Sequence, residues 1–223
     1  MERINLCNYK GILFDFDGTL AVTMEDNYAA WKRAMQHFNV EIAPSDYFPF
    51  EGMKLTEIAG NLCKKYKLNP RHVDEIVKKK EEYYLKNNKF KFYPSVEEIV
   101  AHLKSNNILI GMVTAARLER LEKTIPIDFL NLFNTIITAD KTKAGKPDPE
   151  PYLLGLKELN IKAKDCIAVE NAPLGIESAK NAGLKCIAIC STMDKNYLSK
   201  ADLIIDKFYE LNNLFGADEN RRK

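Results

Sequence analysis

A short apolar segment near the start of the chain lies between two glycines. Residues 11–20 read Gly-Ile-Leu-Phe-Asp-Phe-Asp-Gly-Thr-Leu. A continuous apolar run bounded by turn residues is typical of a strand that is buried on both faces of a parallel sheet. Two carboxylates, Asp15 and Asp17, stand at the carboxyl end of this run. The pattern predicts a central strand that brings acidic side chains to one edge of a sheet.

From Tyr93 onward, helical and strand-like patterns alternate along the chain. The predicted strands are 108–113, 135–139, 166–169, 186–190 and 203–205. The predicted helices are 95–106, 149–160, 173–182 and 207–215. Alternating strands and helices are typical of an α/β fold, so we expect a Rossmann-like, doubly wound parallel sheet. The polar tail 217–223 is expected to be frayed.

The block between the first strand and Tyr93 shows only helical patterns. Apolar residues recur every three or four positions over 24–38, 54–66 and 70–87, a spacing that places them on one face of a helix. We therefore expect an all-helical insertion after the first strand. The expected domains are a core of residues 1–21 and 93–223 and a helical domain of residues 22–92.

Composition narrows the class of protein. The 223 residues include 33 basic and 31 acidic side chains, a formal net charge of +2. A charge this close to zero does not create a positive electrostatic field strong enough to attract nucleic acid or an anionic membrane. Five scattered cysteines without a CxxC pair favour a reducing compartment over a zinc or disulfide framework. The start of the chain lacks the pattern of a signal peptide, and no apolar run approaches the ~20 residues of a membrane span. We expect a cytoplasmic monomer.

Asp15 and Asp17 favour a chemical role over a structural one. Residues two apart on one continuous strand point to the same side of the sheet, so the two carboxylates repel each other unless a cation or a proton intervenes. Burying an unpaired carboxylate costs several kcal/mol. The alternative is that the aspartates only end a strand and cap a turn, which would give no reason for two charges in an apolar run.

Three further polar residues lie at or beyond the ends of other predicted strands. Thr114 directly follows one strand, Glu170 ends another, and Lys146 stands in a loop that Pro147 stiffens. Taken alone, such a threonine is more often a turn residue and such a lysine more often a surface residue. Because the carboxyl ends of parallel strands share one edge of the sheet, we expect all three near Asp15.

Four segments in this order resemble the motifs of the haloacid-dehalogenase-like superfamily. The matching segments are Asp15-Phe-Asp17-Gly18-Thr19 for DxDGT, Thr114, Lys146 within Gly-Lys-Pro-Asp-Pro, and Glu170-Asn171 within Glu-Asn-Ala-Pro-Leu-Gly. The resemblance covers essentially the whole chain. It is nearest to the phosphoglycolate phosphatase and β-phosphoglucomutase-like branch, whose members carry a helical cap where residues 22–92 lie here.

The resemblance implies a catalytic role for each motif. Asp15 would attack a phosphoryl group to give an aspartyl phosphate, and Asp17 would protonate the leaving alcohol and later activate water. Thr114, the neighbouring backbone of Ala115, and Lys146 would hold the phosphoryl oxygens.

The resemblance also implies a Mg²⁺ site. Its ligands would be the Asp15 carboxylate, the Asp17 backbone carbonyl and Glu170, a hard oxygen set that suits this ion. Many relatives have Asp after the acidic residue of the fourth motif, whereas this chain has Asn171. The amide would bind the metal directly or through water, or would act only as a helix cap.

Positions outside the motifs depart from the family pattern and from the mutase. A histidine often found early in the cap is replaced by Asn27. In the mutase, a cap arginine and polar residues after the second motif grip the distal phosphate of a bisphosphate, and the corresponding stretches here are 51–55 and 115–118. Lys54 and Arg117 are candidate partners for an anionic substrate, but the mutase set is incomplete.

The leading interpretation is a Mg²⁺-dependent phosphatase that acts on a small phosphorylated metabolite, with a sugar phosphate as the expected class. The alternatives are a β-phosphoglucomutase-like mutase and a catalytically weak binding protein, the latter motivated by Asn171 and Asn27. Dehalogenation fits less well, because that chemistry does not use a second aspartate such as Asp17. The sequence does not select the substrate, since cap loops and not core motifs do so.

Overall fold

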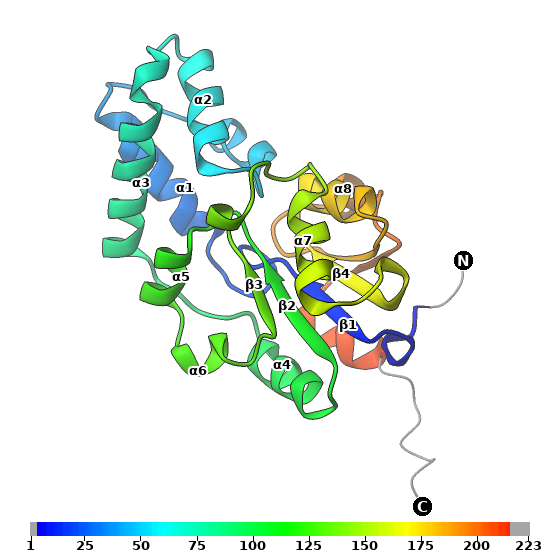
Figure 1. Ribbon diagram of the computed structural model, residues 1–223. Helices are drawn as coiled ribbons and strands as arrows, with labels where there is room; N and C mark the ends of the chain where they lie inside the picture. Colours follow the sequence, from blue (N-terminus) through cyan, green and yellow to red (C-terminus); the bar gives the residue numbers. More distant parts are fainter. Residues whose placement is uncertain (1–3, 215–223) are drawn as a thin grey trace, which may run out of the picture.

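A six-stranded parallel sheet forms the centre of the molecule. The structure, a computed structural model of the chain, describes residues 4–214; the predicted tail 217–223 lies outside them. The strands are β1 (Gly11–Phe14), β2 (Leu109–Val113), β3 (Thr135–Ile137), β4 (Cys166–Glu170), β5 (Lys185–Ile189) and β6 (Leu203–Ile205). Their order is β3-β2-β1-β4-β5-β6, with β1 hydrogen-bonded between β2 and β4 (Figure 1). The doubly wound α/β prediction is confirmed.

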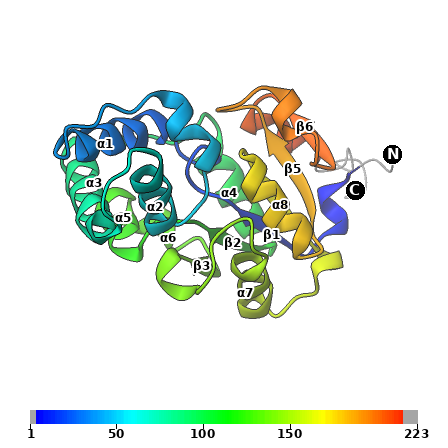
Figure 2. The same cartoon turned by 90° about the horizontal axis from the view of Figure 1, so that it is seen from above.

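Helices cover both faces of this sheet (Figure 2). They are α4 (Val96–Ser105), α5 (Leu118–Thr124), α6 (Ile127–Leu130), α7 (Glu150–Leu159) and α8 (Pro173–Asn181). Successive strand side chains alternate between the two layers, as the pleat requires. Ile12 and Phe14 share a buried cluster with α4, whereas Leu13 between them shares another with α7 and α8.

Three details differ from the sequence prediction. Helices α5 and α6 were not predicted, because 7 and 4 residues are too few to show two full helical periods. The last predicted helix is a 3-10 turn over Phe208–Leu214, and residue 215 lies outside the described chain. Strand β3 ends at Ile137, where the chain passes into a second 3-10 turn.

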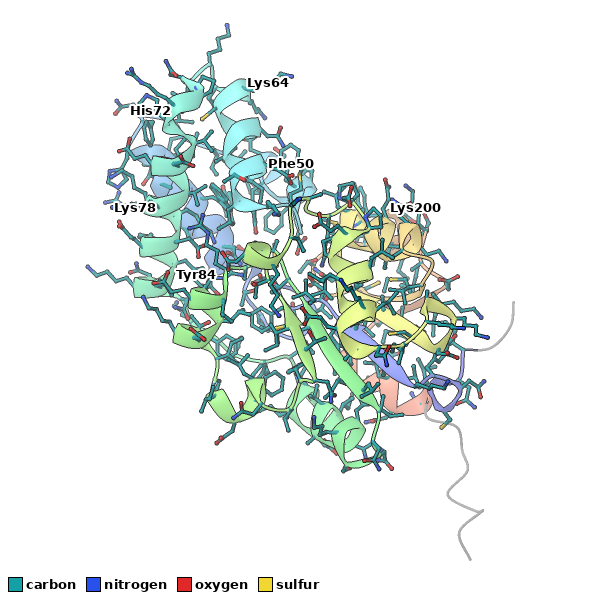
Figure 3. All side chains as sticks on the ribbon, in the orientation of Figure 1. Phe50, Lys64, His72, Lys78, Tyr84 and Lys200 are labelled. Carbon is teal, nitrogen blue, oxygen red and sulfur yellow. The ribbon has the colours of Figure 1, made fainter. Side chains whose placement is uncertain are left out.

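A separate group of helices stands beside the carboxyl edge of the sheet (Figure 1). It comprises α1 (Met24–Gln36), α2 (Leu55–Lys65) and α3 (Val73–Asn87), with a 3-10 turn at Pro70–His72 before α3. The group has its own apolar cluster around Trp31, while Lys64 and Lys78 lie on its outer surface (Figure 3). A β-bridge between Ala21 and Phe92 closes the two connections to the sheet. We therefore propose residues 22–92 as a cap domain on the core.

No helix among residues 4–214 combines the length and the apolar character needed to cross a membrane.

Close contact between β1 and α7 depends on a glycine. A methyl group on Gly155 would come within 3.1 Å of both Leu13 Cδ atoms, and Leu13 is fully buried. By contrast, a methyl group on Gly60 of α2 would have no neighbour within 4 Å. Gly155 is therefore needed because a side chain there would crowd Leu13, whereas a side chain at Gly60 would meet no neighbouring atom.

We expect Gly60→Ala to raise the free energy of unfolding by roughly 0.5–1 kcal/mol through helix propensity. Gly155→Ala should bring no such gain, because crowding against Leu13 opposes it. Leu13→Ala should cost about 2–5 kcal/mol, and in that background Gly155→Ala should become stabilising by about 1 kcal/mol. Urea unfolding of the four variants measures this. Equal effects of Gly155→Ala in both backgrounds would contradict the packing argument.

A buried aspartate fixes the loop before α2. Asp46 accepts hydrogen bonds from the Ala43 amide at 2.8 Å, from the Lys65 ammonium and from the Tyr66 hydroxyl, and only 3% of its side chain is exposed. These donors, Lys65 first and Tyr66 second, lower the pKa of Asp46 from 3.8 to about 2. The ionised form is thus the one that the fold stabilises.

Because the pKa of Asp46 is lower in the folded chain than in the unfolded chain, its contribution to stability is present above pH 4 and is lost as the pH falls toward 2. Asp46→Asn should therefore be less stable than wild type at pH 7, with a difference that shrinks between pH 4 and pH 2. Unfolding measured across this range tests the prediction. Asp74→Asn, which changes an exposed aspartate of α3, is the control; a pH-independent difference for Asp46→Asn would refute the proposed cause.

Candidate active site

The predicted site residues lie at the carboxyl edge of the sheet, beneath the cap. A small cavity of about 30 Å³ is lined from the core by residues that follow β1, β2 and β4, and from the cap by residues of α1, α2 and the loop before α2. The core residues are Asp15, Asp17, Ala115, Arg120, Glu170, Asn171 and Ala172. This space is large enough to hold ordered water.

Lys146 joins two carboxylates at the base of the site. Its ammonium donates to Asp15 Oδ1 and to Glu170 Oε1, each at 2.6 Å, and the Tyr152 hydroxyl donates to the same Glu170 oxygen at 2.6 Å. All four side chains are buried. Burial and the charge of Glu170 raise the pKa of Asp15 to about 7, against the effect of Lys146. Although burial opposes it, the two carboxylates raise the pKa of Lys146.

Thr114 lies beside this cluster. With Ala115 and Lys146 it lines a second small cavity, and its hydroxyl accepts a hydrogen bond from the Ala116 amide at 3.0 Å. Its side chain is 5% exposed. The structure thus brings Asp15, Thr114 and Lys146 to one edge of the sheet.

Asp17 has a cationic partner of its own. Strand β1 ends at Phe14, so the expected continuous strand through both aspartates does not form, and alternation along a strand does not govern their positions. The Asp17 carboxylate accepts from the Thr23 hydroxyl at 2.6 Å, from the Asn27 amide at 3.2 Å and from the Arg120 guanidinium. Although burial opposes it, Arg120 and the Thr23 hydrogen bond lower the pKa of Asp17.

Arg120 belongs to a polar group that joins core and cap and that the sequence analysis missed. It extends from α5 to donate to Asn27 Oδ1 at 2.9 Å, and its guanidinium carbon lies 4.9 Å from the centre of the Tyr84 ring of α3. The same Asn27 oxygen accepts from Lys80 at 2.8 Å, and Lys80 also pairs with Glu81 at 2.7 Å. Burial lowers the pKa of Lys80 to about 8, against Glu81. Because α5 was not predicted, no local pattern pointed to Arg120 at this position.

Asn171 is held between cap and core by its amide group. Its Nδ2 donates to Glu51 Oε1 at 2.8 Å and to Thr192 Oγ1 at 2.9 Å, and its Oδ1 accepts from Thr19 at 3.1 Å. Helix α8 begins after Ala172 without a side-chain cap, so the helix-cap alternative for Asn171 is wrong. An aspartate could not donate to Glu51, which gives a physical reason for the amide at this position.

Glu51 is a further residue that the sequence analysis missed. The residue is 3% exposed and lines the central cavity from the loop between Phe50 and α2. Burial raises the pKa of Glu51 well above its usual value, against the Asn171 hydrogen bond, and the charges of Asp15 and Glu170 raise it further. A lone glutamate in a loop carries no motif, so only its position reveals it.

Two predicted anion-binding residues do not line the central cavity. The Lys54 ammonium instead donates to backbone carbonyls of the loop after β3, at 3.2 Å to Ala139 and 3.0 Å to Lys143, and to that of Thr142. Arg117 is exposed at the start of α5. Lys54 therefore fixes the cap loop to the core and lines only the second small cavity, beside Thr114 and Lys146, whereas Arg117 lines neither cavity.

The acidic groups at the site outnumber the basic groups, so the site can accommodate the charge of an added cation. Four carboxyl groups converge here, from Asp15, Asp17, Glu51 and Glu170, whereas the basic groups bonded to them are Lys146 and Arg120. In addition, Asp15 Oδ2 is buried without a hydrogen-bond partner. Protons on Asp15 and Glu51 would relieve this excess, and so would a divalent ion with oxygen ligands.

The described residues contain no cluster of three or more His, Cys, Asp or Glu side chains with metal-binding geometry. The implied magnesium ligands do not require such a cluster, since one of them is the Asp17 backbone carbonyl and another is the amide-bearing Asn171. The unpaired Asp15 oxygen and the excess of negative charge fit a hard cation.

Comparison with known proteins identifies the family. Over 206 residues the chain is 29% identical to validoxylamine A 7'-phosphate phosphatase of Streptomyces hygroscopicus subsp. limoneus, covering 91% of this chain and 96% of that protein. It is 25% identical to β-phosphoglucomutase of Bacillus subtilis, covering 81% and 83%. The crystal structure of β-phosphoglucomutase from Clostridium difficile has the same fold, with a TM-score of 0.79, 24% identity and coverage of 93% and 97%. A profile of the haloacid dehalogenase-like hydrolases matches residues 12–189, and the chain therefore belongs to this family of enzymes.

Proposed function

We propose that the protein is a Mg²⁺-dependent phosphatase that hydrolyses a small phosphorylated metabolite, a sugar phosphate in the first instance, through an aspartyl phosphate. The observation that carries this proposal is the buried Lys146 between Asp15 and Glu170, with one Asp15 oxygen left unpaired. A carboxylate with one oxygen oriented by an ammonium and the other unpaired is arranged as a nucleophile. The relatives named above act on phosphorylated compounds, in agreement with this assignment.

In the first step, an Asp15 oxygen attacks phosphorus, and the bond from phosphorus to the ester oxygen breaks. The departing alcohol takes a proton from Asp17, which must be in its protonated form for this step although, against burial, Arg120 and Thr23 lower its pKa. In the second step, water loses a proton to Asp17 and attacks the phosphorus of the aspartyl phosphate, which releases inorganic phosphate and restores Asp15. Lys146 and Thr114 bind the phosphoryl oxygens and offset the negative charge that is spread over them in the transition state of each step.

Asp15, Glu170, the Asp17 backbone carbonyl and Asn171 would hold the magnesium ion. When bound, the ion supplies positive charge that keeps Asp15 ionised and offsets repulsion between its carboxylate and the phosphate. Asp15 needs this help, because burial and Glu170 raise its pKa to about 7. The local excess of carboxyl groups thus supports the proposed metal requirement.

A mutase is the second candidate, supported by the likeness to β-phosphoglucomutase. It would transfer the phosphoryl group to a second sugar hydroxyl instead of water. A second phosphate would need a basic partner in the central cavity, and neither Lys54 nor Arg117 lines that cavity. Hydrolysis is therefore favoured over phosphoryl transfer to a sugar. Product analysis with β-glucose 1-phosphate and a bisphosphate primer separates the two activities. A panel of phosphomonoesters assayed with and without Mg²⁺ tests both against a binding protein, which would turn over none.

Asp15→Asn should reduce phosphatase activity by at least about a thousandfold, because it removes the attacking carboxylate while preserving shape. The measurement is kcat/KM for the best ester of the panel. Asp128→Asn makes the same chemical change at an exposed position of α6 and should keep wild-type activity. More than about a tenth of the activity in Asp15→Asn would exclude Asp15 as the nucleophile.

Asp17→Asn should slow turnover by roughly two to four orders of magnitude, with the smallest loss for nitrophenyl phosphate, whose leaving group departs without a proton. Arg120 and Thr23 hold Asp17 ionised, which suits the base that activates water, so phosphate should also accumulate on Asp15. Rates with esters of acidic and ordinary alcohols, together with ³²P labelling, measure both effects. An equal loss for every leaving group would show that Asp17 is not the acid.

A further inference from the structure

The loop that carries Lys146 extends from the core to the cap. It runs from the end of β3 to α7 and lies beside the start of α2 (Figure 1). The Lys54 ammonium of the cap donates to three of its backbone oxygens. They belong to Ala139 at 3.2 Å, to Lys143 at 3.0 Å and to Thr142. An ammonium group has three N–H donors, so this loop accepts all three.

The core holds the same loop by its amide groups. Glu150, the first residue of α7, accepts from the Lys143 amide at 2.9 Å and from the Ala144 amide at 2.6 Å. The loop is therefore bonded on one side to a carboxylate of the core and on the other side to an ammonium of the cap. Removing the ammonium would take the hydrogen bonds of Lys54 away from the loop carbonyls while the amide contacts remain.

Two glycines bring the cap loop into close contact with this core loop. A methyl group on Gly145 would come within 2.7 Å of Lys54 Cγ, and one on Gly52 would lie 3.4 Å from Lys146 Cδ. Gly145 and Lys146 are both buried. The side-chain stem of Lys146 thus lies against the same cap segment that carries Lys54.

The contact with Ala139 reaches the other predicted phosphate-binding element. The Ala139 amide donates to the Ala116 carbonyl at 2.9 Å, and the Ala116 amide donates to the Thr114 hydroxyl at 3.0 Å. Lys54, Thr114 and Lys146 also line one small cavity together. Lys54 therefore binds the loop both beside the turn of Thr114 and close to Lys146.

We propose that Lys54 is a positioning residue for phosphoryl binding, and that the three loop carbonyls form a site for a primary ammonium group. The proposal rests on the proposed phosphatase function and gives Lys54 a part in it without contact to the substrate. Since Lys54 does not line the cavity beside Asp15, it acts through the loop, by fixing Lys146 relative to Thr114. A displacement of about 1 Å in such a group can cost roughly a hundredfold in rate.

Two variants separate the charge of Lys54 from its bulk. Lys54→Met removes the ammonium but keeps most of the length of the side chain, whereas Lys54→Ala also leaves space for an added amine. The control is Lys64→Met, the same change on the exposed surface of α2.

Each protein is assayed with Mg²⁺ on nitrophenyl phosphate and on the best ester of the panel. Both Lys54 variants are assayed again with n-propylammonium, which replaces the atoms that Lys54→Ala removes, and with tetramethylammonium, which has no N–H group. Deuterium exchange of the amides of 139–146 and of the core strands, measured by mass spectrometry, gives a readout that does not need turnover.

We expect both Lys54 variants to lose roughly tenfold to a hundredfold in kcat/KM, by the same factor for both esters, because Lys54 acts on the phosphoryl site and not on the leaving group. n-Propylammonium should raise the activity of Lys54→Ala at least about threefold above its activity in tetramethylammonium, because it supplies three N–H donors. It should not help Lys54→Met, whose side chain fills the space. Exchange over 139–146 should rise in both variants, with the core strands unchanged.

Wild-type activity of both Lys54 variants would overturn the proposal, as would a loss confined to one ester, which would make Lys54 a substrate contact. Unchanged exchange over 139–146, or equal activity of Lys54→Ala in the two amines, would also overturn it. Lys54→Met keeps the bulk of the side chain, so it tests the proposal even if Lys54→Ala does not fold. If the wild type hydrolyses no ester, the phosphatase function fails, and exchange over 139–146 with and without n-propylammonium still decides whether an ammonium group orders this loop.

Discussion

The structure depends above all on one buried ammonium group. Lys146 lies 2.6 Å from both Asp15 and Glu170, and it thereby joins the ends of two neighbouring strands to a loop that follows a third. Two carboxylates at this depth repel each other, and removing one partner from such a cluster typically costs about 3–5 kcal/mol because a buried charge is left unpaired. Lys146 therefore stabilises the fold in the absence of substrate. The same ammonium group is proposed to bind the phosphoryl oxygens.

The ammonium group does not balance all the acids around it. Glu51 and Asp17 add two further carboxyl groups, and Arg120 compensates for only one of them. Burial first, and neighbouring carboxylates second, raise the pKa values of Asp15 and Glu51. Both groups therefore tend to stay protonated when no cation is bound. A site with this excess of acidic groups favours a cation. The proposed magnesium requirement follows from this property.

Polar contacts dominate the junction between cap and core. Asn27 reaches Asp17, Glu51 reaches Asn171, and Lys54 reaches backbone carbonyls of the core, while the apolar cluster around Trp31 stays within the cap. Polar groups that part from one another can bond to water, which lowers the cost of separating them. The cavity of about 30 Å³ lies at this junction, so breaking these contacts would widen it.

The sequence alone was sufficient for the fold and for the acidic and basic residues of the motifs. The apolar run before Asp15 and the alternation after Tyr93 reflect burial, which leaves a local pattern, and so do the helices of the cap. Arg120, Lys80 and Glu51 could not be found in this way. Their partners lie 103, 53 and 120 residues away along the chain, and no local pattern encodes which distant side chain a charge will meet.

The same limit explains the two candidates that do not line the central cavity. Lys54 and Arg117 have the charge that an anionic substrate needs, but residue type does not fix the direction of a side chain. Lys54 turns to the carbonyl groups after β3, and Arg117 faces solvent at the start of α5. The local sequence pattern is enough to predict which acidic and basic motif residues stand at the edge of the sheet. Which of the other charges reach the cavity depends on the packing of the cap on the core, because this packing sets the distances between residues that are far apart in the chain.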